Sequence, residues 1–224
     1  MRTLDELVEK KDPAWPIVRG WLESASNTVD VLPVERENAN ASLLELQVTT
    51  RSPMGAIVYE TGGLLVDHGW LRILGSGSHR LPRSLPDWNA EVAPAPSGTP
   101  SPFLLIADDV LGGFFAIDGG GLTGARGKVH YFAPESLDWQ NLDASYSDFI
   151  GFALSGDLER FYQNSRWPTW RQEIGGLDGD RALSVYPFLW TEGPPVAERS
   201  RRPVPIAELW NLQQDTRRHM RGAG

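Results

Sequence analysis

The clearest pattern of hydrophobic and polar positions lies between residues 145 and 162. Apolar side chains recur there at intervals of three and four residues, which places them on one face of an α-helix: Tyr146, Phe149, Ile150, Ala153, Leu154, Leu158, Phe161 and Tyr162. Ser145 precedes the run and Asp148 follows three residues later, a pair typical of a capped N-terminus. The pattern predicts one continuous amphipathic helix that packs against a sheet.

Further helices are predicted from caps and apolar spacing. Ser52-Pro53 is a favourable cap and first-turn pair, and Gly62-Gly63 end that helix because glycine adopts the left-handed C-cap conformation without steric cost. Residues 38–50 fit both a helix and an alternating strand, and the helix is favoured. The remaining helices are expected from Leu4, behind the capping-box pair Thr3 and Glu6, after Asp12-Pro13, near Trp167 and at Val204.

Short apolar runs between glycine-rich turns predict antiparallel strands. The runs cover residues 64–66, 70–74, 103–107, 111–117 and 128–132, and residues 185–190 are either a strand or a buried run. Asp67-His68-Gly69 and the DGGG sequence at 118–121 have the composition of tight turns, so the first two runs are expected to form a hairpin. Together these elements predict an α+β fold class, with a mainly antiparallel sheet flanked by helices.

Residues 82–102 are the longest segment without a helix or strand pattern, and they are rich in Pro, Ser, Gly, Asp and Asn. Such a segment is either a linker between two domains or a long surface loop. The loop is favoured, because the part of the chain before it is too small to bury a core of its own. We therefore expect residues 1–224 to form one α+β domain with a Pro-rich surface loop at 82–102.

Composition narrows the class of protein. Hydrophobic residues make up 41% of the chain, which includes 9 Trp and 8 Phe, and this is enough for a sizeable core. The absence of Cys excludes a disulfide scaffold and thiolate zinc sites. No apolar stretch has the length of a membrane span or the form of a signal peptide, so a cytoplasmic protein without membrane association is expected.

The net charge of −8 is unevenly distributed along the chain. Residues 198–224 contain six Arg and three acidic residues, so this segment is basic and the rest is strongly acidic. An acidic body disfavours non-specific binding of nucleic acid and favours a basic partner. The Arg-rich stretch Arg199–Arg202 is expected to be a solvated connector, and RNA binding through the basic segment is the alternative.

Catalytic patterns are incomplete. Residues 75–80, GSGSHR, lack the Lys of a phosphate-binding loop, and Leu81-Pro82 block entry into a helix. The chain has no Gly-x-Ser-x-Gly elbow and no His spacing typical of a zinc site. Asp67 and His68 could form an acid–base pair, but neighbouring side chains in a strand point in opposite directions, so a tight turn is favoured.

A second candidate set consists of Asp108, Asp109 and Asp118. These carboxylates could meet at one end of adjacent strands and hold Mg²⁺ or Ca²⁺. Asp before Gly is also common in turns, and the turn interpretation is favoured. We therefore expect no metal, no other cofactor and no catalytic residue. The alternative is a small-molecule or metal-dependent enzyme that uses Asp67 and His68 or the three aspartates.

An acidic and aromatic segment surrounds Trp139. Its carboxylates at Glu135, Asp138 and Asp143 are poor candidates for a glycosidase pair, because a chain with 29 acidic residues offers many such pairs. Trp anchors are enriched at protein interfaces, although core packing of Trp139 is the favoured alternative. The residues expected to contact a partner are Asp108, Asp109, Asp118, Glu135, Asp138 and Trp139.

Several long motifs resemble an uncharacterised bacterial family that is known only as a domain of unknown function. They include "DPAWP", "TTRSPMGAIVYETGGLLVDHGWLRILGSG", "GGFFAIDGG", "YFAPESLDW", "RWPTW", "YPFLWT" and "RSRRPVPIAELW". The resemblance covers almost the whole chain and implies one domain without a known activity.

Residues 52–162 more faintly resemble the SUKH superfamily of Smi/Knr-type proteins. The similar features are a helix ending in Gly-Gly, a strand pair, a strand with a DGGG turn, a return strand and the "YSDFI" helix. This resemblance implies a bent antiparallel sheet beside helices and a protein-binding role, often as an immunity protein that neutralises a toxin. The long Pro-rich segment and the additional helices at both ends depart from the superfamily pattern.

These observations predict a non-catalytic protein-binding module. The resemblance adds an immunity-type role as a hypothesis, and the acidic body fits a basic toxin domain as partner.

Overall fold

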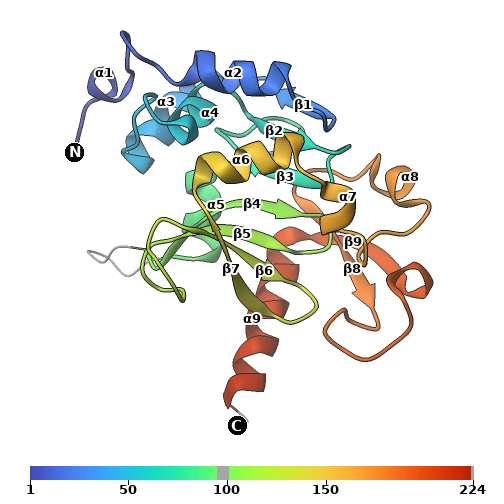
Figure 1. Cartoon of the computed structure of the whole chain (residues 1–224). Helices are drawn as coiled ribbons and strands as arrows, with labels where there is room; N and C mark the ends of the chain where they lie inside the picture. Colours follow the sequence, from blue (N-terminus) through green and yellow to red (C-terminus); the bar gives the residue numbers. More distant parts are fainter. Residues whose placement is uncertain (95–100, 223–224) are drawn as a thin grey trace.

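The computed structural model describes residues 1–94 and 101–222 and has an α+β fold (Figure 1). Seven antiparallel strands form one sheet in which spatial order follows chain order, and two further strands form a separate ribbon. The strands are β1 (Val29–Leu32), β2 (Gly63–Val66), β3 (Leu71–Leu74), β4 (Phe103–Asp109), β5 (Phe114–Asp118), β6 (Val129–Ala133), β7 (Asp138–Ala144), β8 (Arg181–Tyr186) and β9 (Ser200–Pro205).

Helices precede, interrupt and follow the strands. They are α1 (Leu4–Leu7), α2 (Trp15–Glu23), α3 (Arg36–Leu46), α4 (Pro53–Glu60), α5 (Leu85–Val92), α6 (Tyr146–Ser155), α7 (Leu158–Phe161), α8 (Trp170–Ile174) and α9 (Ile206–Gly222), with a short 3-10 turn η1 (Val196–Glu198). In the described part of the chain, none of them combines the length and apolar character needed to cross a membrane.

The predicted N-caps are present, whereas the left-handed glycine C-cap predicted for α4 is wrong, because Thr61 ends that helix in an extended conformation and Gly63 already opens β2. The Ser52 side chain accepts a hydrogen bond from the N–H of Gly55 at 3.0 Å and starts α4. The Ser145 hydroxyl accepts from the N–H of Asp148 at 3.2 Å, and the Asp148 carboxylate accepts from the N–H of Ser145 at 2.9 Å. The helix predicted over part of 38–50 is also confirmed, as α3.

Helices cover both faces of the sheet. Phe114 and Phe115 are neighbours in β5 and therefore point to opposite faces. Phe115 packs on Phe149 of α6 with ring centroids 4.8 Å apart, whereas Phe114 packs on Trp210 of α9 at 4.7 Å. Phe114 also stacks with Trp88 of α5. Thus α6 lies on one face, and α5 and α9 lie on the other.

The hairpin prediction is confirmed. β2 and β3 pair antiparallel, with Val66 opposite Leu71, and residues 67–70 connect them. Asp67, His68 and Gly69 have φ values of 49°, 60° and 87°. Asp and Gly tolerate this left-handed region better than most residues, which explains the composition of the turn.

The prediction of one continuous helix over 146–162 is wrong. α6 ends at Ser155, Gly156 is extended with ψ of 170°, and α7 begins at Leu158. The Asn27 side chain donates to the carbonyls of Ala153 and Gly156 at 3.0 and 3.1 Å, so a segment distant in sequence satisfies the end of α6. The apolar stripe continues across this break, which is why spacing alone did not reveal it.

The Pro-rich segment is not a loop throughout. Residues 85–92 form α5, and Leu85, Pro86 and Trp88 are buried. Ser84 caps this helix, and a proline is compatible with its first turn because the N–H there has no helical partner. Residues 95–100 of the predicted loop lie outside the described part of the chain.

Several strand predictions need correction. The strand predicted over 111–117 begins only at Phe114, because Gly112, with φ of 81°, belongs to a turn. The run at 185–190 contains only the end of β8. Arg199–Arg202, predicted to be a solvated connector, mostly lies in β9, which pairs with β8. β1 and β7 lie in segments without a predicted strand.

Candidate functional site

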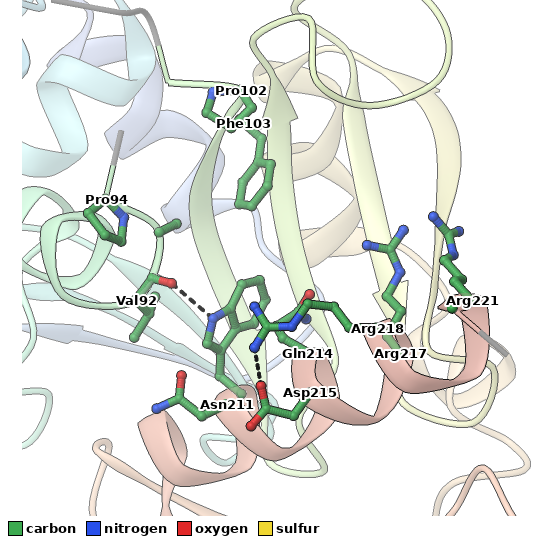
Figure 2. A pocket seen from close by; sticks show the side chains of 13 residues that line it. Val92, Pro94, Pro102, Phe103, Asn211, Gln214, Asp215, Arg217, Arg218 and Arg221 are labelled. Atoms are coloured by element: carbon green, nitrogen blue, oxygen red, sulfur yellow. Dashed lines mark hydrogen bonds and ion pairs between the residues drawn. The ribbon is translucent and has the colours of Figure 1, made fainter. Parts of the chain in front are cut away.

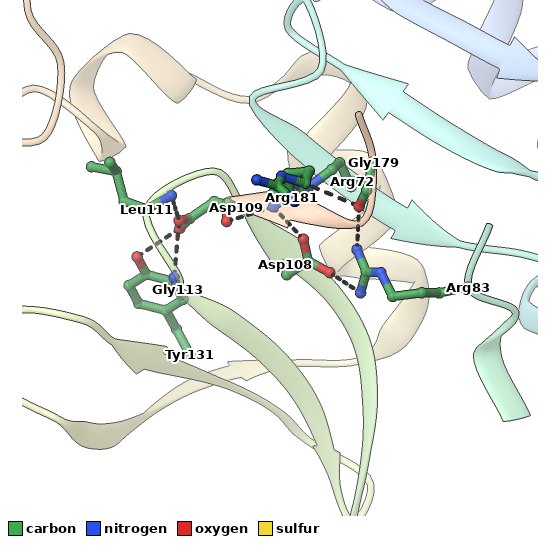
Figure 3. Close-up of polar contacts among 9 residues, drawn as sticks. All are labelled: Arg72, Arg83, Asp108, Asp109, Leu111, Gly113, Tyr131, Gly179 and Arg181. Carbon is green, nitrogen blue, oxygen red and sulfur yellow. Dashed lines mark hydrogen bonds and ion pairs between the residues drawn. The ribbon is translucent and has the colours of Figure 1, made fainter. Parts of the chain in front are cut away.

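The predicted residue Asp108 lies in a buried polar cluster rather than at the surface (Figure 3). Arg72 of β3 is directly opposite Asp108 of β4 in the sheet register. The Asp108 carboxylate lies 2.6 Å from Nη2 of Arg72 and 2.8 Å from Nη1 of Arg83. The three side chains are 0%, 2% and 8% exposed, respectively. One carboxylate therefore pairs with two guanidinium groups inside the protein, and the three side chains together keep one positive charge.

Backbone carbonyls complete the cluster. Arg72 donates to the carbonyls of Asp109 at 2.9 Å and of Arg181, and Arg83 donates to the carbonyl of Gly179 at 2.7 Å. Burial lowers the pKa of Arg72, and the neighbouring Asp108 opposes this shift. These bonds join β3 and β4 to the segment before β8, so the cluster has a structural role in the described conformation.

Asp109 is buried separately. Its Oδ1 accepts from the N–H groups of Leu111 and Gly113, each at 2.9 Å, and its Oδ2 accepts from the Tyr131 hydroxyl at 2.9 Å. Burial raises the pKa of Asp109, although these donors oppose the shift. A Cβ at Gly113 would lie 2.2 Å from the Asp109 carboxylate, so only glycine fits. The carboxylate holds the turn between β4 and β5.

The three aspartates do not converge. Asp118 is opposite Phe103 at one end of β4, whereas Asp108 is opposite Phe114 at the other end. Asp118 accepts from the N–H groups of Gly120 and Leu122 at 2.7 and 3.0 Å, and it holds its own turn. Loss of contact with water raises the pKa of Asp118, but the hydrogen bonds from these N–H groups lower it by more, so the pKa lies below its usual value. The described residues contain no group of three potential metal ligands of the His, Cys, Asp or Glu type.

The side chains of Asp67 and His68 form no hydrogen bond with each other in the described residues. Asp67 instead pairs with Arg166, and the ring of His68 approaches Trp170 edge-on with centroids 6.1 Å apart. The Arg166 guanidinium lies 4.8 Å from the ring centre of Trp70 and 4.4 Å from that of Trp170. Asp67 thus orients a buried cation that lies between aromatic rings.

The acidic and aromatic segment lies mainly in β7. Trp139 packs on Phe103 and Phe132 with ring centroids 5.3 and 5.2 Å apart, which agrees with the core-packing alternative. Glu135 is exposed and has no ion pair within the described residues. Asp138 is exposed and pairs with Arg217 and Arg221 of α9, at 3.4 and 2.7 Å. Asp138 is thus a predicted partner-binding residue whose ion pairs connect it to α9, and the same arginines of α9 line a groove at the surface.

This groove has a volume of about 610 Å³ and is here called the α9 groove (Figure 2). It is lined by Val92, Ala93, Pro94, Pro102, Phe103, Trp210, Asn211, Gln214, Asp215, Arg217, Arg218, Arg221 and Gly222. The indole N–H of Trp210 donates to the carbonyl of Val92 at 3.0 Å and joins α9 to the end of α5. With Phe103, these residues form the apolar part of the groove.

Cations dominate the other part of the α9 groove. The side chains of Arg217, Arg218 and Arg221 are 22%, 77% and 60% exposed. Arg218 pairs with Asp215, and the other two share one oxygen of Asp138, so three guanidinium groups face two carboxylates.

Two donors in this part of the groove, one of them on Arg217 itself, lack an acceptor in the described residues. They are Nε2 of Gln214 and Nε of Arg217, both buried and without a hydrogen-bond partner in the described residues. The helical spacing of Trp210, Arg217, Arg218 and Arg221 is the sequence signal for the groove, and net charge alone does not show it.

Comparison with known proteins agrees with the first resemblance. Residues 4–209 match the family model described as protein of unknown function DUF2625. The chain is 46% identical to the uncharacterized protein YbfG of Escherichia coli (strain K12) over 213 residues, which covers 95% of this chain and 96% of that protein. It is 42% identical to an uncharacterized protein of Haemophilus influenzae over 189 residues, with 84% and 83% covered.

No solved structure matches the chain significantly. The family match covers most of the sequence and both relatives are aligned over most of their length. The chain therefore belongs to the DUF2625 family of bacterial proteins of unknown function.

Proposed function

We propose that this protein is a non-catalytic recognition module that binds an acidic segment of another protein in the α9 groove. The observation that carries the proposal is the pair of donors, Gln214 Nε2 and Arg217 Nε, that lack acceptors in the described residues. A carboxylate supplies acceptors to such donors, and charged hydrogen bonds are stronger than neutral ones. The apolar wall at Phe103 would receive a hydrophobic side chain of the same segment.

The arrangement of the candidate acids supports a non-catalytic role. Asp67, Asp108, Asp109 and Asp118 each accept hydrogen bonds or form ion pairs within the chain. A general acid or base needs a free path to the substrate within hydrogen-bond reach. The alternative function as a small-molecule or metal-dependent enzyme would require these internal contacts to be replaced.

The local charge of the α9 groove, rather than the net charge of the chain, decides which ligand charge the groove favours. The sequence predicts a basic partner because the net charge is −8. Charges farther apart than about 8 Å are largely screened at physiological ionic strength, so the arginines nearest to a ligand decide its preferred charge. An acidic segment therefore fits the α9 groove better than a basic one.

RNA is the less suitable ligand for this surface. Single-stranded nucleic acid is usually held by a cationic groove together with exposed aromatic rings on which bases stack. Trp210 is almost fully buried and its indole N–H is used by Val92. Among the residues that line the groove, the half-buried ring of Phe103 is then the one aromatic surface left for stacking, so the arginines supply charge with little stacking area.

An immunity-type role is the second candidate, and it rests on the fainter resemblance of residues 52–162 to the SUKH superfamily. In that case the partner is a bacterial toxin. A basic toxin domain would be attracted to the acidic remainder of the chain and would not require the α9 groove. The two candidates thus predict different contact surfaces.

Site-specific photocrosslinking tests the proposal. Benzoylphenylalanine is placed at Asn211, which is exposed and lines the α9 groove, and the full-length protein is irradiated in its host cells. We expect a crosslinked peptide with several Asp or Glu residues. The double variant R218E/R221E should reduce this crosslink at least tenfold, because charge reversal replaces attraction with repulsion.

The matched control reverses Arg19 of α2, which is exposed and pairs with Glu23 as Arg218 pairs with Asp215. R19E should leave the crosslink unchanged. The proposal is overturned if Asn211 crosslinks to no protein, if it crosslinks to RNA, or if R19E and R218E/R221E have equal effects. A toxin captured only from positions outside the groove supports the immunity-type candidate instead.

A further inference from the structure

A second cavity lies away from the α9 groove, beside the buried cluster of Figure 3. It has a volume of about 160 Å³ and is lined by Leu65, His68, Gly69, Arg72, Arg80 and residues 174–179. We call it the 174–179 cavity. This volume equals about five liquid water molecules and is below the range of about 300–1,000 Å³ for drug-sized ligands. It can hold one small ion or one group of a larger molecule.

The cavity contains donors without acceptors. The Nε–H of Arg72 is buried and has no hydrogen-bond partner in the described residues, although the other guanidinium nitrogens are bonded. The backbone N–H groups of Gly176 and Asp178, which are exposed residues, also have no acceptor in the described part of the chain. A buried unpaired donor is costly, so the Nε–H of Arg72 in this small cavity indicates an acceptor ligand, to which the exposed N–H groups of Gly176 and Asp178 can also donate.

The charged side chains around the cavity favour an anion. Arg72 and Arg80 line it, and the only carboxylate among the lining residues is Asp178, which is exposed. Arg80 pairs at 3.0 Å with Asp30, which does not line the cavity. Both partners are about 60% exposed, so solvent screens this pair and the guanidinium can turn toward a ligand.

Two glycines of the segment have different surroundings. A Cβ at Gly176 would meet no atom within 4 Å, so this part of the backbone borders open space. A Cβ at Gly179 would lie 2.4 Å from the carbonyl oxygen of Arg80, so only glycine allows this close approach. Successive backbone N–H groups in a glycine-rich segment are a common way to bind an oxyanion.

We propose that the 174–179 cavity binds a phosphate group, held by Arg72 Nε, Arg80 and the N–H groups of Gly176 and Asp178. A tetrahedral oxyanion offers acceptors in several directions, which suits donors that come from two side chains and one backbone segment. This site lies on elements other than the α9 groove, so it stands or fails independently of the proposed protein recognition.

Calorimetric titration of the full-length protein with inorganic phosphate, against sodium chloride of equal ionic strength, tests the site. We expect one phosphate per chain. R80Q should weaken binding about tenfold or more, because a charged hydrogen bond is lost. The fold should persist, since the only ion pair removed is exposed. R19Q, which removes another exposed arginine from an ion pair, should leave affinity unchanged.

Amide NMR provides a second measurement that does not depend on the variants. Phosphate should shift the N–H signals of Gly176 and Asp178 and leave those of α9 in place. The absence of phosphate-specific heat and of these shifts at tens of millimolar phosphate overturns the proposal, as does equal weakening by R80Q and R19Q. Glycerol phosphate distinguishes the sources: binding as tight as phosphate indicates a phosphorylated molecule, and binding of phosphate alone indicates the free ion.

Discussion

Nη1 of Arg83 lies 2.8 Å from Oδ2 of Asp108. Arg83 directly precedes the N-cap of α5 and Asp108 lies in β4, the central strand of the sheet, so this ion pair links α5 to the sheet. The same carboxylate is shared with Arg72, and all three side chains are buried. A buried charge is tolerated only when it is paired, because desolvation of an isolated ion is very costly. The stability of the folded state therefore depends on the Asp108 carboxylate.

Replacement of Asp108 by Ala should lower the free energy of unfolding by about 3–5 kcal/mol, since it leaves two buried guanidinium groups without their carboxylate. Urea denaturation followed by circular dichroism measures the change. The control is D30A, which breaks the exposed pair with Arg80 and should cost no more than about 1 kcal/mol. Equal decreases in the free energy of unfolding for D108A and D30A would show that the buried ion pairs of Asp108 stabilise the fold no more than an exposed ion pair does.

Asp109 should make stability depend on pH. Because burial raises its folded-state pKa above the unfolded value of about 3.9, its contribution is fully present below that value and is lost as pH rises through the folded-state pKa. D109N retains an acceptor for Leu111 and Gly113 but does not titrate. The wild type should therefore lose stability relative to D109N from about pH 4 upward. Urea titrations at several pH values test this, and a constant difference would contradict it.

Local signals in the sequence were sufficient for many elements. Ser52, Ser145 and Asp148 cap helices as expected, because these bonds involve residues only three positions apart. The α+β class and the β2–β3 hairpin followed from glycine-rich turns between apolar runs. β7 and β9 did not follow, because their residues are mostly polar or exposed and present no clear alternation.

The candidate sites were less accessible from the sequence. Arg72 meets Asp108 only because β3 and β4 pair in one particular register, and Asp118 lies at the far end of β4 for the same reason. A shift of the β3–β4 pairing by one residue would move Asp108 out of its position opposite Arg72. The α9 groove likewise joins Phe103 to Arg217 across more than a hundred residues. Such contacts depend on tertiary packing, which periodicity does not encode.

Trp88 should be essential to the packing of α5. It is buried, stacks with Phe114 at a centroid distance of 6.4 Å, and lies beneath the guanidinium of Arg83 at 4.5 Å. W88A should cost about 3–5 kcal/mol through lost burial and a residual cavity. E91A, an exposed change on the same helix, should alter stability by no more than about 0.5 kcal/mol. A stability near that of the wild type for W88A, measured by urea denaturation, would show that residues 85–92 behave as a loop in solution.

Gln213 offers the opposite test, in which removal of polar atoms should stabilise the protein. It is fully buried in α9, and neither its amide nitrogen nor its amide oxygen has a hydrogen-bond partner in the described residues. Q213M keeps the shape and removes both unpaired groups, so it should raise stability by about 1 kcal/mol or more. For a chain of this size that corresponds to about 2–4 °C in Tm by calorimetry. Q172M, an exposed change in α8, should leave Tm unchanged within about 1 °C. A lower Tm for Q213M would mean that the Gln213 amide is satisfied in solution, and that its polarity is required where α9 meets the turn at Gly112.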